Sequence, residues 1–318
     1  MDQELVYVGK ILSLSPIQGA DFIVSATAVC GAGGKWMGVV RKNQFKLGDP
    51  CLVYLPDSVV PESEEMAFMK STGWRVKMRN FKGAPSEVVI MPYTGLSAIG
   101  TDYTQAAGVK RFLKPIAASL AADAKGDFPW FLRKTDEPNW QKVPQSVELL
   151  QGKGYYITEK ADGSSTTAYM RAGQFGLCSR NLELKESANN GYWQVANHYG
   201  LKENLPDGYA IQWETCGPKI QKNPMGFTEI VGRAFSVWSI DNQEYLDYKD
   251  FVDFCDDLCF PTVRILEVGS SFECADLNEK AKGFYENGHK REGIVIRSQR
   301  HINAHVVSFK AINLEYDE

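Results

Sequence analysis

The chain has 318 residues, of which 44% are hydrophobic and 23% are charged, and its formal net charge is −4. This length and balance predict a globular protein that divides into two domains. No apolar run approaches the roughly 20 residues of a membrane-spanning helix, and the acidic N-terminus is unlike a signal peptide. We therefore expect an intracellular, cytoplasmic protein with no membrane partner, in which any contact with nucleic-acid phosphates comes from a local basic patch.

Cysteine and histidine spacing indicates neither a disulfide framework nor a zinc site. The seven cysteines are odd in number and include no Cys-x-x-Cys pair. The four histidines lack metal-ligand spacing with cysteine or acidic partners, and we assign no chemistry to them. They are His198, His289, His301 and His305.

Short apolar runs broken by glycine and proline fill the first third of the chain and predict a small all-β domain, which we place at residues 1–103. The runs lie at residues 6–8, 36–40, 51–55 and 87–91. A basic stretch at residues 75–82 stands out within this domain. If it is extended, Arg75, Lys77 and Arg79 share one face, with Val76 and Met78 on the other, and such a stripe can track a phosphate backbone. The predicted RNA contacts are Arg75, Lys77, Arg79 and Lys82. A solvated strand face is the alternative.

Strand-like runs alternate with two helical patterns in the second part of the chain, residues 104–318, whose beginning is a lead-in segment. The strand-like runs lie at residues 155–158, 166–170, 209–214, 234–240, 293–297 and 305–309. The helical patterns lie near residues 191–199 and 248–259. They predict an α+β domain built on antiparallel sheets.

Lys160 directly follows one of these strand-like runs, in the sequence Glu-Lys-Ala-Asp-Gly-Ser-Ser. In an extended chain Lys160 and Asp162 point the same way, which brings an amine and a carboxylate together. Gly163 allows the backbone to approach a ligand. The Lys-x-Asp-Gly pattern alone is weak evidence, so its context decides.

Three segments supply that context: Trp-Glu-Thr-Cys-Gly-Pro-Lys-Ile-Gln-Lys-Asn-Pro from residue 213, Arg-Glu-Gly-Ile-Val-Ile-Arg from residue 291 and Ser-Phe-Lys-Ala-Ile-Asn from residue 308. With Lys160 they resemble the nucleotidyltransferase motifs of ATP-dependent RNA ligases, a covalent superfamily shared with DNA ligases and mRNA capping enzymes. The stretch Gly-Pro-Lys-Ile-Gln-Lys-Asn-Pro favours RNA over DNA ligases. The resemblance covers nearly the whole chain, since the first domain looks like the small OB-like β-barrel of one ligase branch, a fold that commonly binds oligonucleotides.

The resemblance implies a role for each motif residue. Lys160 would form a lysyl-AMP intermediate with ATP, and Lys310 would contact the α-phosphate, where charge grows in the transition state. A lysine nucleophile must be neutral, and its ordinary pKa is about 10.4, so Lys310 or a bound metal has to lower it. Asp162 and Glu292 would organise a hydrated Mg²⁺ or Mn²⁺.

The remaining implied contacts concern the nucleotide. Glu214 would hold the ribose hydroxyls, and the planar guanidinium of Arg180 would reach a phosphate. Glu159 would accept from the adenine amino group. Phe235 would stack on the base, with Trp238 as the competing candidate.

We therefore expect an ATP-dependent RNA ligase that works in three steps, as a monomer, on RNA with nicked duplexes or broken ends as substrates; an RNA/DNA hybrid is a further candidate. The alternatives are a GTP-dependent capping-type guanylyltransferase and a non-catalytic RNA-binding protein. One departure concerns the last motif, where many relatives have two alternating basic residues: Ser308 and Ile312 flank Lys310, which implies a thinner phosphate clamp. The chain ends at Glu318, so we expect the first domain to select the substrate.

Overall fold

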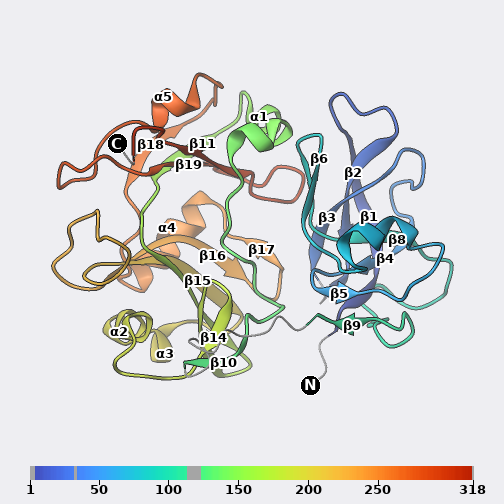
Figure 1. Cartoon of the computed structure of the whole chain (residues 1–318), viewed down its shortest axis with the longest axis horizontal. Coiled ribbons are helices and arrows are strands. Elements are labelled where there is room, and N and C mark those ends of the chain that lie inside the picture. Colours follow the sequence, from blue (N-terminus) through green and yellow to red (C-terminus); the bar gives the residue numbers. More distant parts are fainter. Residues whose placement is uncertain (1–3, 32–33, 113–122, 317–318) are drawn as a thin grey trace. The chain divides into compact units, whose positions relative to one another are not determined.

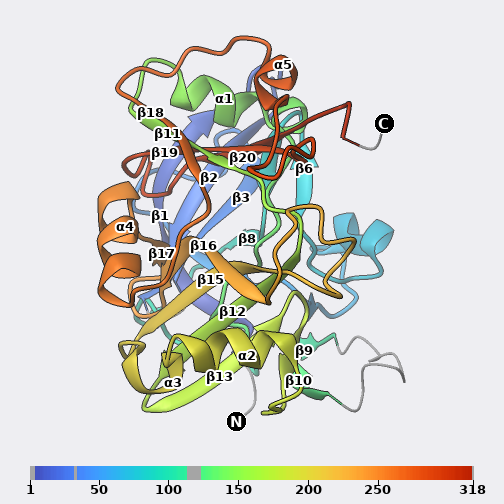
Figure 2. The same cartoon turned by 90° about the vertical axis from the view of Figure 1, so that its left-hand side faces the viewer.

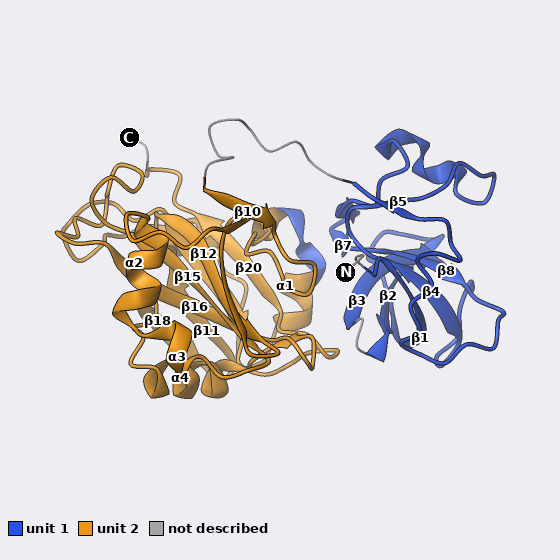
Figure 3. Cartoon of the chain, turned by 90° about the horizontal axis from the view of Figure 1, so that it is seen from below, with its two compact units in different colours: residues 1–116, 142–145 blue, residues 117–141, 146–318 orange. Residues whose placement is uncertain are grey.

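The computed structural model describes residues 4–31, 34–112 and 123–316. The chain forms two compact units, each described here by itself (Figure 3). Unit 1 comprises residues 1–116 and 142–145, and unit 2 comprises residues 117–141 and 146–318. The domain boundary after residue 103 stays a prediction. None of the described helices is long and apolar enough to span a membrane.

Unit 1 contains a five-stranded antiparallel sheet with the strand order β3-β2-β1-β4-β8 (Figure 1). Its strands are β1 (Val6–Pro16), β2 (Ile23–Val29), β3 (Lys35–Arg41), β4 (Pro50–Tyr54) and β8 (Val89–Pro92). Short elements complete the unit: β5 (Ser58–Val59) pairs with β9 (Lys110–Arg111), β6 (Arg79–Phe81) pairs with β7 (Ala84–Ser86), and η2 is a 3₁₀ helix (Ala67–Thr72). The all-β expectation is confirmed, and β2 is the sheet strand that the sequence patterns missed.

Unit 2 is built from two antiparallel sheets. The seven-stranded sheet has the order β10-β14-β13-β12-β15-β16-β17, and the four-stranded sheet has the order β18-β11-β19-β20. The seven strands are β10 (Ala124–Asp127), β12 (Ser164–Arg171), β13 (Gln174–Ser179), β14 (Leu182–Leu184), β15 (Tyr209–Cys216), β16 (Val231–Ser239) and β17 (Glu244–Tyr245). The four strands are β11 (Tyr155–Glu159), β18 (Ile265–Gly269), β19 (Gly293–Ser298) and β20 (Ser308–Ile312).

Besides η2, the described residues form short helices: η3 (Trp140–Lys142), α1 (Pro144–Leu150), α2 (Gly191–His198), α3 (Leu201–Asn204), α4 (Tyr248–Asp257) and α5 (Leu277–Ala281). The two predicted helices are α2 and α4. Each begins at a side-chain cap, since Asn190 accepts from the amide of Tyr192 and Asp247 accepts from that of Asp250. The predicted α+β class with antiparallel sheets is confirmed.

Helices α2 and α4 cover one face of the seven-stranded sheet (Figure 2). Trp193 of α2 and Phe251 of α4 pack there with Trp213 of β15 in one buried cluster. Because side chains alternate along a strand, the neighbours of Trp213 on β15, Gln212 and Glu214, point to the opposite face. That opposite face is where β11 leads into β12, and it carries the candidate site.

Candidate active site

Lys160 follows the last residue of β11, and both its backbone amide and its backbone carbonyl are hydrogen-bonded. Its amide donates to the carbonyl of Gly293 at 3.0 Å, which continues the ladder with β19. The hydroxyl of Tyr285 donates to the Lys160 carbonyl at 2.9 Å. The five residues of β11 are all buried, so the lysine side chain projects from a rigid base.

The Lys160 side chain meets Glu292, the residue just before β19. Its Nζ lies 2.5 Å from Oε2 of Glu292, and each side chain is 22% exposed. Lys310 comes from β20, opposite Val295 on β19. Burial, followed by the charge of Lys160, lowers the pKa of Lys310, while Glu292 acts in the opposite direction. The structure thus brings together Lys160, Glu292 and Lys310 from separate sequence motifs.

Glu214 faces the same site from β15. Burial raises the pKa of its carboxyl to about 8. The charge of Lys160 lowers this pKa, whereas the carboxylates of Glu292 and Asp162 raise it further. The amide of Gly163 donates to this carboxyl. A Cβ at position 163 would lie 2.3 Å from the carbonyl oxygen of Thr215 and 3.0 Å from Cγ of Glu214. Only glycine fits here, which explains the last residue of the Lys-x-Asp-Gly pattern.

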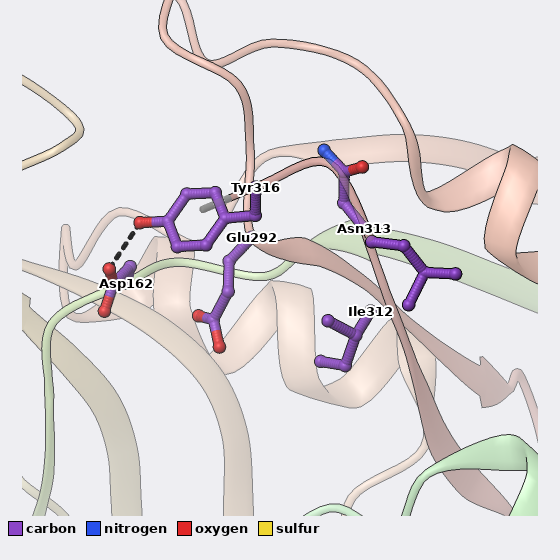
Figure 4. Close-up of a pocket in the computed structure, with 6 residues that line it drawn as sticks. Asp162, Glu292, Ile312, Asn313 and Tyr316 are labelled. Atoms are coloured by element: carbon purple, nitrogen blue, oxygen red, sulfur yellow. Dashed lines mark hydrogen bonds between the residues drawn. The ribbon is translucent and has the colours of Figure 1, made fainter. Parts of the chain in front are cut away.

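Asp162 and Glu292 line one pocket of about 390 Å³ together with Tyr316 (Figure 4). The Tyr316 hydroxyl donates to Oδ2 of Asp162. Asn313 fixes the turn that carries Tyr316: it is 2% exposed, its amide donates to the carbonyl of Glu292, and its side chain donates to that of Arg291. The other lining residues are Ile312 and Leu314.

This pocket suits a divalent cation that keeps part of its water shell. Among residues 4–31, 34–112 and 123–316, no group of three or more histidine, cysteine or acidic side chains is placed to hold a metal. Two carboxylates on one pocket, with a third nearby whose pKa they raise, create a field that favours a cation. Mg²⁺ and Mn²⁺ accept such sparse oxygen ligation because water completes their coordination.

One carboxylate oxygen of Glu159 is an acceptor without a hydrogen-bond partner. The Glu159 side chain is 4% exposed, and Oε2 makes no hydrogen bond. Burial raises the pKa of this carboxyl, while the charges of Arg264 and Arg291 act in the opposite direction. An unpaired buried oxygen is costly, so this atom is available to a ligand that donates a hydrogen bond.

The two candidate base platforms differ in their surroundings. Trp238 is 2% exposed, its indole N–H donates to the Phe131 carbonyl at 3.1 Å, and it packs in a separate buried cluster. Phe235 is partly buried and packs against the cluster that contains Ala161, next to Lys160. The register of β15 and β16 shifts at this point, and a bulge of this kind can re-aim a side chain. Phe235 therefore packs beside Ala161, and Trp238 belongs to a separate buried cluster; which of the two stacks on a base stays a prediction.

Arg180 follows β13 and is exposed, with an ion pair to Asp136 at 2.5 Å. Asp136 also acts on the site, since its charge raises the pKa of Lys310. The segment around Asp136 joins both sheets: Thr135 contacts Ser165 of β12, and Glu137 pairs at 2.8 Å with Arg297 of β19. Asp136 thus pairs with Arg180 and also acts electrostatically on Lys310.

Some residues of the site escaped the sequence patterns. Tyr285 and Tyr316 lie outside the four motifs, and their hydroxyls contact the backbone of Lys160 and the side chain of Asp162. Glu137 lies in the lead-in segment, and its partner Arg297 lies near the end of the apolar strand β19. The one cue to this pair was that a charged residue in an apolar strand is costly unless it is paired.

The structure agrees only in part with the geometry predicted for the basic stretch in unit 1. Val76 is 1% exposed, as an apolar backing requires, but Met78 is 58% exposed, and only Arg79–Phe81 forms a strand, β6. Arg75 pairs with Asp57 and stacks on Phe112, with Cζ 3.8 Å from the ring centroid.

The stretch ends in a tight turn. Lys82 adopts a positive φ of 51° between β6 and β7, and its ammonium donates to the carbonyl of Gly19. This turn follows Arg79 and separates only Lys82 from the predicted face. The RNA-binding roles of Arg75, Lys77, Arg79 and Lys82 stay predictions.

Family models match both parts of the chain. The RNA ligase family model matches residues 153–312, and a model for an OB-fold domain matches residues 5–93. No protein of curated function matches the chain.

Solved structures of a Naegleria gruberi RNA ligase are similar over nearly the full length. The form with pyrophosphate has 28% identity and a TM-score of 0.56, and covers 99% of this chain and 98% of that one. A variant with ATP and manganese has 27% identity and a TM-score of 0.57, with coverage of 98% and 96%. A variant with AMP and manganese has 27% identity and a TM-score of 0.57, with coverage of 99% and 98%.

Proposed function

The chain belongs to the RNA ligase family, and from that premise we propose that it seals 3′-hydroxyl and 5′-phosphate ends through a lysyl-AMP intermediate on Lys160. The observation that carries the proposal is the meeting of four motif residues from separate strands and loops at one place. Lys160 and Glu292 are in contact, and Lys310 and Glu214 both respond to the charge of Lys160.

In the first step, the lone pair of Lys160 Nζ attacks the α-phosphorus of ATP. A phosphorus–nitrogen bond forms, the bond to the bridging oxygen breaks, and pyrophosphate leaves. The lysine must first lose a proton, which the neighbouring cation Lys310 and a bound divalent ion would both favour, while the carboxylate of Glu292, 2.5 Å from Nζ, orients the amine. Lys310 stabilises the charge that grows on the α-phosphate.

The nucleotide is held by groups around this lysine. Glu214 accepts from the ribose hydroxyls and Phe235 stacks on the base, while the unpaired Oε2 of Glu159 accepts from the adenine amino group. Arg180 exchanges its exposed partner Asp136 for a phosphate.

Asp162 and Glu292 are the residues that would hold Mg²⁺ or Mn²⁺ at the pocket they share. A bound divalent ion supplies positive charge that disfavours a protonated lysine and neutralises phosphate oxygens. The Naegleria gruberi RNA ligase variants with manganese support a divalent cofactor.

In the second step the AMP group moves from Lys160 to an RNA 5′-phosphate, which restores the lysine. In the third, a 3′-hydroxyl attacks that 5′-phosphate, a phosphodiester forms and AMP leaves. We propose the nicked duplex as the substrate, because a template strand holds the two ends together and so lowers the entropic cost of their reaction.

The test offers the protein ATP or GTP labelled at the α-phosphate, then a panel of nicked duplexes with ribose or deoxyribose at each side of the nick. We expect a covalent label from ATP and sealing that requires ribose. A covalent label from GTP alone would contradict ATP dependence, and equal sealing of single strands would contradict the nicked substrate.

A further inference from the structure

The side-chain hydroxyl of Tyr285 connects the two loops that carry Lys160 and Glu292. The residue is 3% exposed. Its hydroxyl donates to the carbonyl of Lys160 at 2.9 Å and accepts from the amide of Glu292 at 3.1 Å. A hydroxyl can donate one hydrogen bond and accept others, so this single group satisfies both backbone atoms.

Tyr285 is itself held on a firm support. Residues 283–291 form a hairpin, in which the Tyr285 amide donates to the His289 carbonyl and the Arg291 amide donates to that of Gly283. The guanidinium of Arg291 donates to three carbonyls at the end of α5, where a helix leaves such groups without internal partners. These are the carbonyls of Lys280, Ala281 and Lys282.

The consequence for the reaction follows from geometry. Lys160 and Glu292 contact each other through their side chains, and their backbones are held by one common group. A displacement of about 1 Å at an attacking atom can cost roughly a hundredfold in rate.

We propose that Tyr285 is a positioning residue for lysine adenylylation, which sets the distance between the nucleophile Lys160 and Glu292 through their backbones. The inference rests on the proposed function, since it assumes that Lys160 is the nucleophile. Tyr285 contacts no reacting atom and acts through Lys160 and Glu292.

The test compares Tyr285→Phe with Tyr169→Phe. Tyr169 is also buried, and its hydroxyl donates to Glu183 at 2.8 Å on another part of the same unit, so its variant also loses one hydroxyl. We measure the single-turnover rate of AMP adduct formation across ATP concentrations, the sealing of a strand already adenylylated at its 5′ end, and the thermal midpoint.

For Tyr285→Phe we expect adduct formation to slow about tenfold, with the ATP concentration for half-maximal rate and the sealing of the pre-adenylylated strand changed less than about twofold. Tyr169→Phe should leave the adduct rate unchanged. An adduct rate for Tyr285→Phe within twofold of the natural protein would overturn the proposal. Equal slowing of adduct formation and of pre-adenylylated sealing would also overturn it, because that pattern indicates a general structural role.

Amide hydrogen exchange on the natural protein tests the contact without any variant. The Glu292 amide should exchange slowly, and exchange as fast as in an exposed loop would overturn the proposal even if Tyr285→Phe does not fold. If Lys160→Ala still takes up AMP, the proposed function fails, while the exchange measurement still reports on the contact of Tyr285.

Discussion

The basic residues near Lys160 in unit 2 and those of the stretch 75–82 in unit 1 differ in how far they are buried. Lys160 and Lys310 are partly buried beside acidic groups on adjoining strands. Lys77 and Arg79 are exposed. Burial makes each charge near Lys160 costly unless it has a partner or a ligand, whereas exposed cations cost little. A buried charged residue is therefore stronger evidence for a functional site than an exposed one.

The largest effect that tests this comparison is expected at Lys310. Lys310→Ala should slow AMP adduct formation by about 10²–10³-fold, the range for loss of one group that stabilises a transition-state charge. The measurement is the single-turnover rate with labelled ATP. Lys77→Ala is the matched control, a lysine in an exposed position, and it should leave this rate unchanged. Similar rates for both variants would break the comparison.

A second effect is expected in the pH dependence of stability, through Glu214. Its carboxyl has a pKa of about 8 when folded, against an ordinary value of 4.5. Between these values the folded protein binds a proton that the unfolded chain has released, so stability falls as pH rises through this window.

Glu214→Gln removes that dependence. At pH 9 its thermal midpoint should exceed that of the natural protein by a few degrees, because the variant has no buried carboxyl to deprotonate. In a unit of this size, each 1 kcal/mol of stability corresponds to roughly 2–4 °C. At pH 4 the two midpoints should be close. Parallel pH profiles would show that Glu214 is not buried as described.

A smaller effect is expected in unit 1, where RNA binding by Lys77 and Arg79 is to be distinguished from a structural role of Arg75. Lys77→Glu combined with Arg79→Glu should weaken RNA sealing several-fold at physiological salt and leave AMP adduct formation intact, because exposed cations attract phosphates through screened charge. Unchanged sealing would remove the RNA-binding assignment.

The smallest effect is expected at Arg75. Arg75→Glu breaks the pair with Asp57 and the stacking on Phe112, so it should lower the stability of unit 1 by about 1 kcal/mol. Sealing at a temperature well below unfolding should change little. A loss of sealing without a loss of stability would instead make Arg75 an RNA contact.

The sequence predicted unit 2 well where the backbone is regular. Alternating apolar residues located β11, β15 and β19, and the motif residues that flank or lie on these strands meet at the site. The strand predicted at residues 305–309 begins only at Ser308, because Asn303 and Ala304 adopt positive φ in a turn that joins Ile302 to His305. Local patterns do not show such turns.

Contacts made by the fold could not be read from spacing. Whether Phe235 or Trp238 reaches the site depends on a register shift between β15 and β16. The partner of Arg75 is 18 residues away, at Asp57, and the hydroxyl of Tyr285 reaches Lys160 across 125 residues. Such pairs depend on tertiary packing, which no motif records.

The most direct test of the account is the intact mass of the protein after incubation with ATP and Mg²⁺ or Mn²⁺, followed by mapping of the modified peptide. We predict a gain of one AMP group, located on the peptide that contains Lys160 and absent from Lys160→Ala. An unchanged mass for the natural protein, or the same gain in Lys160→Ala, would contradict the account.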